Sequence, residues 1–417
     1  MSVNDSTIWW QVYPLGFTHA PIRPSSNAQR VLTPRLDALL PWLDYLIGMG
    51  ANGLLLGPIF ASQTHGYDTV DYYRIDPRLG DDATFDRLID ACQQRGIRVM
   101  LDGVFNHVGR EHPLFVEALA GRGHDNMFHI TRHADGTVDY AKFEGHPELP
   151  ELNHDSDEVV QMVTDVMLYW LRRGASAWRL DAAYAVNPAF WARVLPTVRR
   201  EFPHAWIMGE VIHGDYSAIV QESGMDSLTQ YELWKAIWSC QESANFWELD
   251  WSLKRHNEFL QTFTPLTFVG NHDVTRIASK IGDAGAALAM TILCTVGGVP
   301  SIYYGDEQAF HGVKRECLGG DDDIRPGYPD TPAELSHAGE WMYHLIQGLI
   351  DIRRRNPWLV HATTTPLHLD NRHYTYEAVG KHDNERIVVD LNLDPEPHAV
   401  ISQNGVALMH VHGRAQS

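Results

Sequence analysis

Cysteine is scarce in this 417-residue chain, which has only Cys92, Cys240, Cys294 and Cys317. Their spacing fits neither a site of paired cysteine ligands nor a redox pair. A disulfide framework is therefore not expected, and buried free thiols in a reducing compartment are the default for such residues. The first residues, MSVNDSTIWW, also lack the basic and long apolar regions of a secretory signal. Both observations predict a cytoplasmic protein.

Basic residues are also few relative to acidic ones. The chain has 33 Lys and Arg against 53 Asp and Glu, which gives a formal net charge of −20. Such an excess repels nucleic acids and anionic membrane surfaces. We also find no apolar run that approaches the length of a membrane span. The predicted ligand is therefore neutral, and neither nucleic acid nor a membrane is expected as a partner.

No glycine-rich phosphate loop follows the first apolar run, which argues against a doubly wound nucleotide-binding sheet. Instead, short apolar runs alternate with longer amphipathic segments. The runs predicted as strands are 8–15, 53–60, 97–105, 176–183, 205–212, 265–273 and 297–307, and the segments predicted as helices are 35–49, 83–95, 159–173, 188–202, 232–240, 284–296 and 338–355. About seven or eight such units predict an α/β fold with a (β/α)8 barrel, or TIM barrel.

Two stretches break this alternation. Residues 107–154 follow the third predicted strand and are rich in His, Gly and acidic residues, so we expect a short inserted domain there. From residue 358 the chain changes to short runs such as HYTYEAV and RIVVDLNL, which are typical of a small antiparallel β domain. The predicted domains are a barrel in two parts, 1–106 and 155–357, with the insert 107–154 and the C-terminal domain 358–417.

Polar side chains collect at the C-terminal ends of the predicted strands, where barrel enzymes carry their chemistry. These residues are Tyr67 and Asp68 after the second strand, Asp102, Asn106 and His107 at the third, Arg179 and Asp181 at the fourth, Glu210 at the fifth, and Asn271, His272 and Asp273 at the seventh. One such Asp is more often a helix N-cap than a catalyst. Several carboxylates at one rim repel each other, however, and need a metal, an arginine or a catalytic role.

The segments that hold these residues resemble the four motifs of the α-amylase family of glycoside hydrolases. They are DGVFNH (102–107), WRLDAA (178–183), GEV (209–211) and FVGNHD (268–273), in the order of the family. LPELN (149–153) is similar to the additional motif of the family's inserted domain, and VPSIYYGDE (299–307) to its last barrel strand. The resemblance covers roughly residues 7–355, whereas residues beyond 358 match only in position and β character.

The resemblance implies a retaining glycosidase, whose two catalytic carboxyl groups lie roughly 5–5.5 Å apart. Asp181 would be the nucleophile that forms a glycosyl-enzyme, and Glu210 the general acid and then the base. Asp273 would be the third carboxylate, which grips sugar hydroxyls and helps to distort the ring. Arg179 would hold Asp181 ionised and aligned, with Asp102 behind it as a support.

The resemblance also implies a set of sugar-binding residues. His107 and His272 match residues that bind hydroxyls of the glucose at the cleavage site, and Asn271 accompanies His272 in the same segment. Tyr67 matches the aromatic residue that stacks on that glucose, and Asp68 follows it as a further candidate. Asp321 and Arg325, in GGDDDIRPGYP (319–329), resemble a loop used two sugars back from the cleaved bond. The three adjacent aspartates there fit a solvated turn equally well.

The chain departs from the family pattern just after the nucleophile. Tyr184 and Ala185 replace the Lys-His pair of many α-amylases and the Asn-Glu pair of maltogenic and cyclodextrin-degrading relatives. Subsites for long starch chains are therefore not expected there. Ala182 is small, which in the α-glucosidase branch accompanies α-1,4 rather than α-1,6 cleavage. The implied substrate is a short or cyclic α-glucan oligosaccharide. Digestion of sugars with different glycosidic linkages would identify it best.

No organic cofactor is implied, and a structural calcium ion is an open expectation. The family's calcium site would use Asn106, a carboxylate of the inserted domain and backbone oxygens. The histidine-rich stretch 112–133 fits no standard metal spacing. Because the barrel begins by residue 7, the N-terminal domain through which some relatives dimerise is not expected, and the chain is predicted to be a monomer or a homodimer.

Two alternatives to a hydrolase remain open. A transglycosylase would share every catalytic residue and differ in how well acceptor sugars compete with water. An inactive barrel that only binds carbohydrate would lack at least one of the three carboxylates, whereas Asp181, Glu210 and Asp273 are all present.

Overall fold

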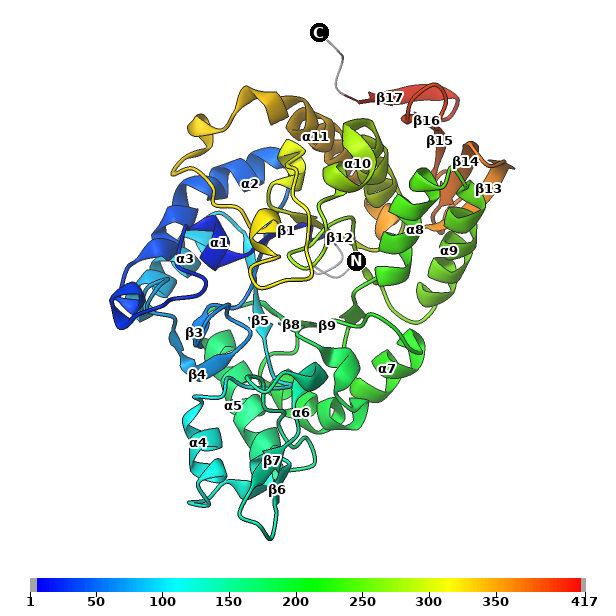
Figure 1. The fold of residues 1–417 in the computed structure, drawn as a ribbon. Coiled ribbons are helices and arrows are strands. Elements are labelled where there is room, and N and C mark those ends of the chain that lie inside the picture. The colour runs from blue at the N-terminus through cyan, green and yellow to red at the C-terminus, as the bar shows by residue number, and fades with distance from the viewer. Residues whose placement is uncertain (1–5, 414–417) are drawn as a thin grey trace. The chain divides into compact units, whose positions relative to one another are not determined.

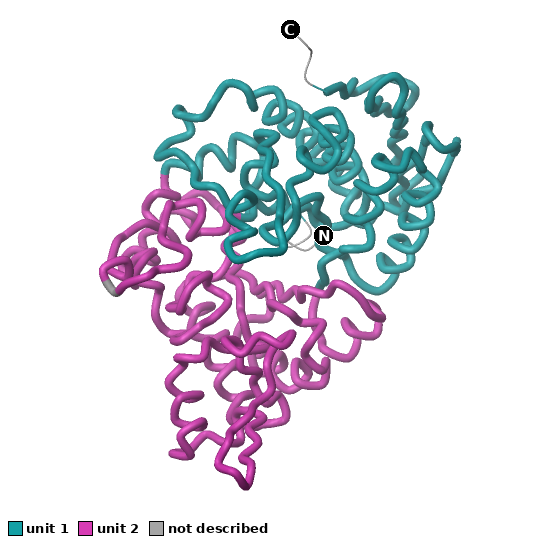
Figure 2. Tube along the Cα trace, in the orientation of Figure 1, with its two compact units in different colours: residues 1–11, 41–53, 227–417 teal, residues 12–40, 54–226 magenta. Residues whose placement is uncertain are grey.

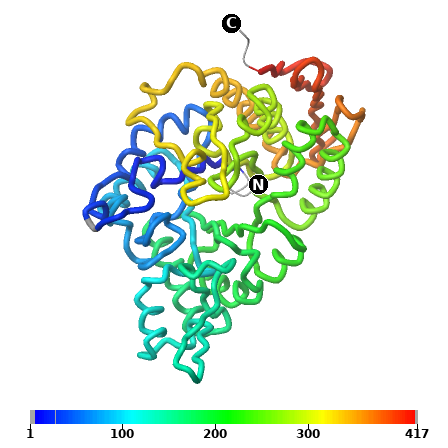
Figure 3. Tube along the Cα trace, in the orientation of Figure 1, coloured from blue at the N-terminus to red at the C-terminus, as the bar shows by residue number. Residues whose placement is uncertain are grey.

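The computed structural model describes residues 6–413 of the chain (Figure 1). The chain divides into two compact units (Figure 2). Unit 1 consists of Met1–Gln11, Pro41–Gly53 and Ser227–Ser417, and unit 2 of Val12–Leu40 and Leu54–Asp226. Figure 3 shows the course of the chain by residue number, and Figure 1 labels its strands and helices.

Eight strands form one sheet in the order β10, β9, β8, β5, β2, β1, β12, β11. Their bounds are β1 (Trp9–Val12), β2 (Gly53–Leu56), β5 (Arg98–Gly103), β8 (Ala177–Leu180), β9 (Trp206–Gly209), β10 (Ser227–Leu228), β11 (Leu266–Phe268) and β12 (Val299–Tyr303). Within unit 1, Thr229 follows β10 and pairs in parallel with Leu266 of β11, so the two ends of the order meet. The sheet is the nearly closed parallel barrel that the sequence predicts.

The barrel strands are short and almost wholly buried. Every residue of β8 and β9 is buried, as expected for parallel strands that are covered on both faces. The sixth strand, β10, has two residues and was not predicted, because a run this short leaves no pattern in the sequence.

Five of the seven predicted helices begin and end close to observed ones. The observed helices are α1 (Pro14–Phe17), α2 (Leu43–Met49), α3 (Asp82–Gln94), α4 (Pro113–Leu119), α5 (Asp157–Arg172), α6 (Pro188–Glu201), α7 (Tyr216–Ser223), α8 (Tyr231–Glu242), α9 (Phe246–Phe259), α10 (Ile277–Thr295) and α11 (Glu340–Arg355). Of these, α1, α4, α7 and α9 were not predicted. Asp81 begins α3 because its side chain accepts a 2.9 Å hydrogen bond from the Thr84 amide. The short 3-10 helices are 27–30, 35–42, 125–127, 143–145, 183–185, 306–308, 322–324, 332–334, 337–339 and 357–361.

Two predicted helices differ from those observed. The segment 35–49 was predicted as one helix, but Arg35–Trp42 is a 3-10 helix and only α2 is α-helical. Pro41 lies inside the 3-10 part, where it lacks an amide proton for an α-helical bond. The helix predicted at 284–296 is the C-terminal part of α10, which Gly282 interrupts with φ 74° and ψ 170°.

The expectation that no apolar run approaches the length of a membrane span was wrong, because α10 reaches that length. Among residues 6–413 it is the one helix long and apolar enough to cross a membrane, with a mean hydropathy of 1.4 in its apolar window. That window is 67% buried inside the protein, as in the core helix of a barrel.

The inserted segment and the C-terminal segment form separate small sheets. In the insert, β6 (Ile130–Arg132) pairs with β7 (Val138–Tyr140), and β3 (Phe60–Ser62) pairs with β4 (Thr69–Ile75) earlier in unit 2. The C-terminal sheet has five strands in chain order: β13 (Thr363–Leu369), β14 (His373–Val379), β15 (Arg386–Asn392), β16 (His398–Gln403) and β17 (Val406–His412). All four pairs are antiparallel, as predicted for this segment.

None of the four cysteines forms a disulfide, as the sequence predicts. Cys92, Cys240 and Cys294 are buried, and burial raises the pKa of each thiol, to about 12 for Cys92. Cys317 is exposed, which differs from the expectation that all four are buried.

A buried histidine, His256 in α9, makes the stability of unit 1 depend on pH. Its Nε2 donates to the Gly297 carbonyl at 3.0 Å, and Nδ1 accepts from the Gln230 amide at 3.2 Å. Burial lowers the pKa of His256 to about 4, below the unfolded value of 6.5. A depressed histidine pKa gives stability that is present above pH 6.5 and is lost as the pH falls toward 4.

We therefore expect the wild-type protein to lose about 2 kcal/mol more unfolding free energy between pH 7.5 and pH 5 than His256→Gln. Urea titrations of both proteins at the two pH values measure this difference. Comparing each protein with itself cancels the pH-independent cost of the substitution. Equal pH dependence in the two proteins would contradict the assignment.

Candidate active site

The ends of β5, β8 and β9 bring four charged residues of unit 2 together. Asp102 pairs with Arg179 in the parallel register of β5 and β8. Arg179 Nη1 lies 2.7 Å from Asp102 Oδ1 and 3.2 Å from Asp181 Oδ1, and its Nη2 lies 2.6 Å from Glu210 Oε1. Asp181 and Glu210, which follow β8 and β9, thus contact one planar guanidinium. The sequence predicted the contacts of Arg179 with the two aspartates but not the contact with Glu210.

This cluster is buried and carries an excess of negative charge. All four side chains are at most one-tenth exposed. Burial alone would lower the pKa of the Arg179 guanidinium, but Asp102 and Glu210 outweigh it and raise that pKa well above its usual range. Arg179 is therefore a fixed cation that three acidic side chains share. With all three acids ionised the cluster has a net charge of −2, and with one of them protonated it has a net charge of −1. Both states favour a positive centre.

The backbone after Asp181 holds the second oxygen of Glu210. Ala182 has φ 47° and ψ 35°, a left-handed conformation that is uncommon for residues other than glycine. Its amide donates a 3.1 Å hydrogen bond to Glu210 Oε2, while Oε1 contacts Arg179. Both oxygens of Glu210 are thus oriented by the segment that carries Asp181. Strain of this kind persists where the surrounding structure fixes it, often at active sites.

Tyr67, His107 and Asn106 form a second layer around the cluster. The Tyr67 hydroxyl donates to Asp102 Oδ2 at 3.1 Å. His107 Nε2 donates to the Tyr67 carbonyl at 3.0 Å, and Nδ1 accepts from the Asn106 side-chain amide at 3.1 Å. Burial lowers the pKa of His107 to about 3, so its ring is neutral. Because both ring nitrogens have protein partners, a sugar hydroxyl must replace one of them to bind His107.

Asp68 has a local partner in the same loop. Its two carboxylate oxygens accept hydrogen bonds from the amide and the hydroxyl of Thr64, at 3.0 and 2.5 Å. Asp68 is buried, so these bonds fix the loop that presents Tyr67. A direct role of Asp68 in sugar binding stays a prediction.

A calcium ion near Asn106 stays a prediction. The Asn106 Nδ2 donates to His107 Nδ1 at 3.1 Å, whereas an asparagine binds calcium through its side-chain oxygen. Calcium prefers six to eight oxygen ligands, several of them from carboxylates. Among residues 6–413, no group of three His, Cys, Asp or Glu side chains gathers at Asn106. The histidine-rich stretch 112–133 likewise contains no such group in the described part of the chain.

Unit 1 holds the other predicted site residues around Asp273. Arg325 Nη2 lies 2.8 Å from Asp273 Oδ1 and 3.2 Å from Asp321 Oδ2, and His272 Nε2 lies 2.9 Å from Asp273 Oδ2. Asn271 Oδ1 accepts from the Asp273 amide at 2.9 Å. Both oxygens of Asp273 are therefore oriented by cationic or donor groups. The role of Asp321 and Arg325 two sugars from the cleaved bond stays a prediction, and the structure adds the contact of Arg325 with Asp273.

A buried ion pair holds the loop that carries Arg325. Arg276 Nη1 donates to Asp306 Oδ1 at 2.9 Å, and its Nη2 donates to the Ile324 carbonyl at 2.9 Å. Arg325 itself donates from Nε to the His272 carbonyl at 2.9 Å. The turn 319–329 is thus a fixed part of this site and not only a solvated turn.

Several contacts at the site were not predicted from the sequence. Gln11 in β1 donates to His272 Nδ1 at 3.1 Å, and the Tyr231 hydroxyl accepts from Asn271 at 2.9 Å. In unit 2, Phe143 of the insert stacks on the His107 ring with centroids 4.5 Å apart. The neighbouring Glu144 accepts a 2.8 Å hydrogen bond from the Tyr184 hydroxyl. These partners are distant in the chain and belong to no motif.

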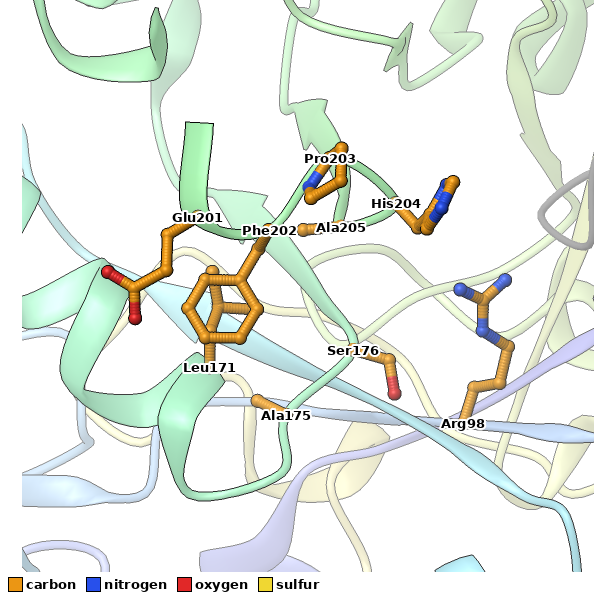
Figure 4. A pocket seen from close by; sticks show the side chains of 9 residues that line it. All are labelled: Arg98, Leu171, Ala175, Ser176, Glu201, Phe202, Pro203, His204 and Ala205. Carbon is orange, nitrogen blue, oxygen red and sulfur yellow. The ribbon is translucent and has the colours of Figure 1, made fainter. Parts of the chain in front are cut away.

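A pocket of about 390 Å³ lies at the other end of the same strands of unit 2 (Figure 4). It is lined by Arg98, where β5 begins, and by Phe202 and His204, which precede β9. The charged cluster lies where these strands end, so this pocket is not part of it.

A parallel barrel that carries a pair of carboxyl groups at its strand ends has the arrangement used by glycoside hydrolases. A family model described as alpha amylase, catalytic domain, matches residues 11–333. The chain belongs to the α-amylase family, and it is a glycoside hydrolase of that family.

The names of its relatives refer to cyclomaltodextrins, to maltose and to maltosyl sugars. The chain is 29% identical to a cyclomaltodextrinase from Bacillus sp. over 97% of its own length and 75% of the relative. It is 30% identical to the intracellular maltogenic amylase of Bacillus subtilis (strain 168), over 75% of its own length and 58% of the relative. It also resembles the solved cyclic alpha-maltosyl-(1→6)-maltose hydrolase from Arthrobacter globiformis in complex with that sugar, with a TM-score of 0.80, 25% identity and 98% of both chains covered.

Proposed function

We propose that this chain hydrolyses α-1,4-glucosidic bonds of short or cyclic malto-oligosaccharides in the cytoplasm, with retention of anomeric configuration. The observation that carries the proposal is the buried guanidinium of Arg179, shared by Asp102, Asp181 and Glu210. The net negative charge of this cluster favours the positive charge that develops at the anomeric carbon in an oxocarbenium-like transition state.

In the first step Asp181 attacks the anomeric carbon. The bond between this carbon and the glycosidic oxygen breaks, and Glu210 gives its proton to that oxygen, which leaves as the hydroxyl of the released sugar. Arg179 orients both carboxyl groups, and the Ala182 amide fixes the second oxygen of Glu210. The first step therefore ends with a glucosyl ester on Asp181 and an ionised Glu210.

In the second step Glu210 takes a proton from water. The water oxygen bonds to the anomeric carbon, and the ester bond to Asp181 breaks. Two inversions at the same carbon give net retention. Asp273, oriented by Arg325 and His272, is proposed to bind sugar hydroxyls, as its motif implies.

The proposed substrate class rests on the net charge of the chain and on Tyr184, which follows the nucleophile Asp181 in the sequence. The ligand is neutral, consistent with a chain of formal charge −20. Tyr184 donates a hydrogen bond to Glu144 of the insert. It occupies the position where α-amylases that act on long starch chains carry other residues, and we propose that it favours short or cyclic glucans. The names of the cyclomaltodextrinase and intracellular maltogenic amylase relatives support this substrate class and the cytoplasm.

The proposal is tested by digesting a panel of maltose, maltotriose, isomaltose, panose, β-cyclodextrin, pullulan and starch, with products identified by chromatography and their anomers by NMR. We expect maltotriose and β-cyclodextrin to be cleaved fastest, isomaltose to be inert, and the α-anomer to form first. A β-anomer as first product, or isomaltose as the preferred substrate, would contradict the proposal. Longer oligosaccharides formed from concentrated maltotriose would identify a transglycosylase instead.

A further inference from the structure

Two histidines and an aspartate gather on the β13–β14 hairpin of the C-terminal sheet, within unit 1. His368, Asp370 and His373 each offer one ligand atom, and these atoms lie within 4.8 Å of one another. Among residues 6–413 this is the one group of three or more His, Cys, Asp or Glu side chains with such a spacing. The spacing H-x-D-x-x-H crosses a turn and matches no standard metal motif, so the cluster was not predicted from the sequence.

Hydrogen bonds orient Asp370 toward the histidines. Its Oδ1 accepts from the backbone amides of Arg372 and His373, each at 2.8 Å, and its Oδ2 lies 3.1 Å from His368 Nε2. The Asp370 amide donates to the His373 carbonyl at 2.9 Å, which closes the turn. The backbone bond from Arg372 and the bond from His368 hold the pKa of Asp370 below its usual range. The carboxylate is therefore ionised and already points at one histidine.

The register of the sheet places both histidines on one face. His368 pairs with Thr375, and Thr375 lies two residues from His373 on the same face of β14. A bulge between Pro366 and His368 re-aims His368 at this point. The two imidazole centroids are 4.5 Å apart.

A fourth side chain supports His373 from the neighbouring strand. Asp390 of β15 accepts from His373 Nε2 at 2.7 Å, which leaves Nδ1 as the nitrogen for a ligand. Metal-binding histidines commonly donate their second N–H to a carboxylate in this way. Thr375 also donates to Asp390, so this carboxylate is itself held in place.

The donor set selects the class of ion. Two imidazoles and one carboxylate are typical of zinc sites, which bind three protein groups and a water in tetrahedral geometry. Ligand atoms on such an ion lie roughly 3.3 Å apart, close to the 3.1 Å between His368 and Asp370. The side chains of His368 and Asp370 are about half exposed, so they can rotate to close the longer gap and water can complete the shell.

We propose that His368, Asp370 and His373 form a zinc-binding site on the β13–β14 hairpin, with Asp390 as the carboxylate that orients His373. Zinc bound there ties the turn between the two strands. The Asn371 carbonyl in this turn accepts a 3.1 Å bond from the Phe246 amide where α9 begins, so the ion also stiffens the attachment of the hairpin to α9.

The test is a zinc titration of the chelator-treated full chain against a chromophoric competitor. We expect one zinc per chain with a Kd on the order of micromolar. His368→Ala and His373→Ala should each lose roughly 100-fold or more in affinity, and Asp390→Asn about tenfold, as for other groups that orient a ligand. Cobalt added in place of zinc should give the visible absorption of a tetrahedral site in the wild type but not in His373→Ala.

The matched control is His398→Ala, which removes a histidine of the same sheet that stacks on His412 and lies outside the cluster. This variant should bind zinc like the wild type.

Zinc should also raise the Tm of the wild type and of His398→Ala but not that of His368→Ala. His368→Gln repeats the test if His368→Ala unfolds without metal. Equal zinc affinity in the wild type and both His368 variants, or no binding by the wild type, would overturn the proposal. Neither result depends on glycosidase activity.

Discussion

Replacement of Asp181 by asparagine is expected to lower kcat on maltotriose by roughly 10⁴-fold or more, the scale of loss when a covalent nucleophile is removed. An amide cannot form the glucosyl ester, yet it has nearly the same shape and keeps a contact with Arg179 Nη1, which lies 3.2 Å from Asp181 Oδ1. The loss should therefore appear in kcat with little change in KM. Initial rates at saturating maltotriose measure it.

The matched control for this variant is Glu201→Gln. Glu201 also pairs with an arginine of unit 2, Arg172, but on the exposed ends of α5 and α6. Its activity should equal that of the wild type. Removal of a general acid or base alone typically lowers a rate by roughly 100-fold or more. If Asp181→Asn kept more than about one-tenth of the wild-type kcat, the loss would be smaller than that, and Asp181 would not be the nucleophile.

Loss of the shared guanidinium is the second large effect that we expect. Arg179→Leu leaves Asp102, Asp181 and Glu210 buried without their cation, and breaking a buried ion pair in this way costs about 3–5 kcal/mol of unfolding free energy. Activity should disappear as well, because both catalytic carboxyl groups lose their common partner. Urea unfolding followed by tryptophan fluorescence measures the loss.

Arg179→Lys is the second variant of this test, since a lysine keeps the charge but cannot contact three acids in the plane of a guanidinium. It should fold with a smaller loss of stability and still be nearly inactive. Arg172→Leu, which breaks the exposed pair with Glu201, should leave the unfolding free energy almost unchanged. Wild-type stability in Arg179→Leu would contradict the shared-cation account.

The sequence predicted most of the elements that are long enough to show a period. α5 and α6 begin within two residues of the predicted positions, because their apolar residues recur at helical spacing. β10 was missed because two residues carry no period. α9 was missed because Trp247 and Trp251 are exposed. These large apolar residues on the outer face hide the helical spacing of the buried apolar residues.

The gathering of the site's polar residues at strand ends was predictable, but most of their partners were not. Asp181, Glu210 and Arg179 lie in recognisable motifs at strand ends. Contacts such as Gln11 with His272, or Arg325 with Asp273, join residues far apart in the chain, and only the folded chain defines them. For the same reason the sequence could not show that both ring nitrogens of His107 already have protein partners.

The central claim is that Asp181 forms a covalent bond with the sugar, and trapping this ester tests it most directly. Glu210→Gln cannot activate water, whereas α-glucosyl fluoride needs no acid, because fluoride leaves as the anion when Asp181 bonds to the anomeric carbon. Mass spectrometry of this variant after incubation should show one added glucosyl group, on the peptide that contains Asp181. A glucosyl group on another residue, or unlabelled protein that still releases fluoride, would contradict the account.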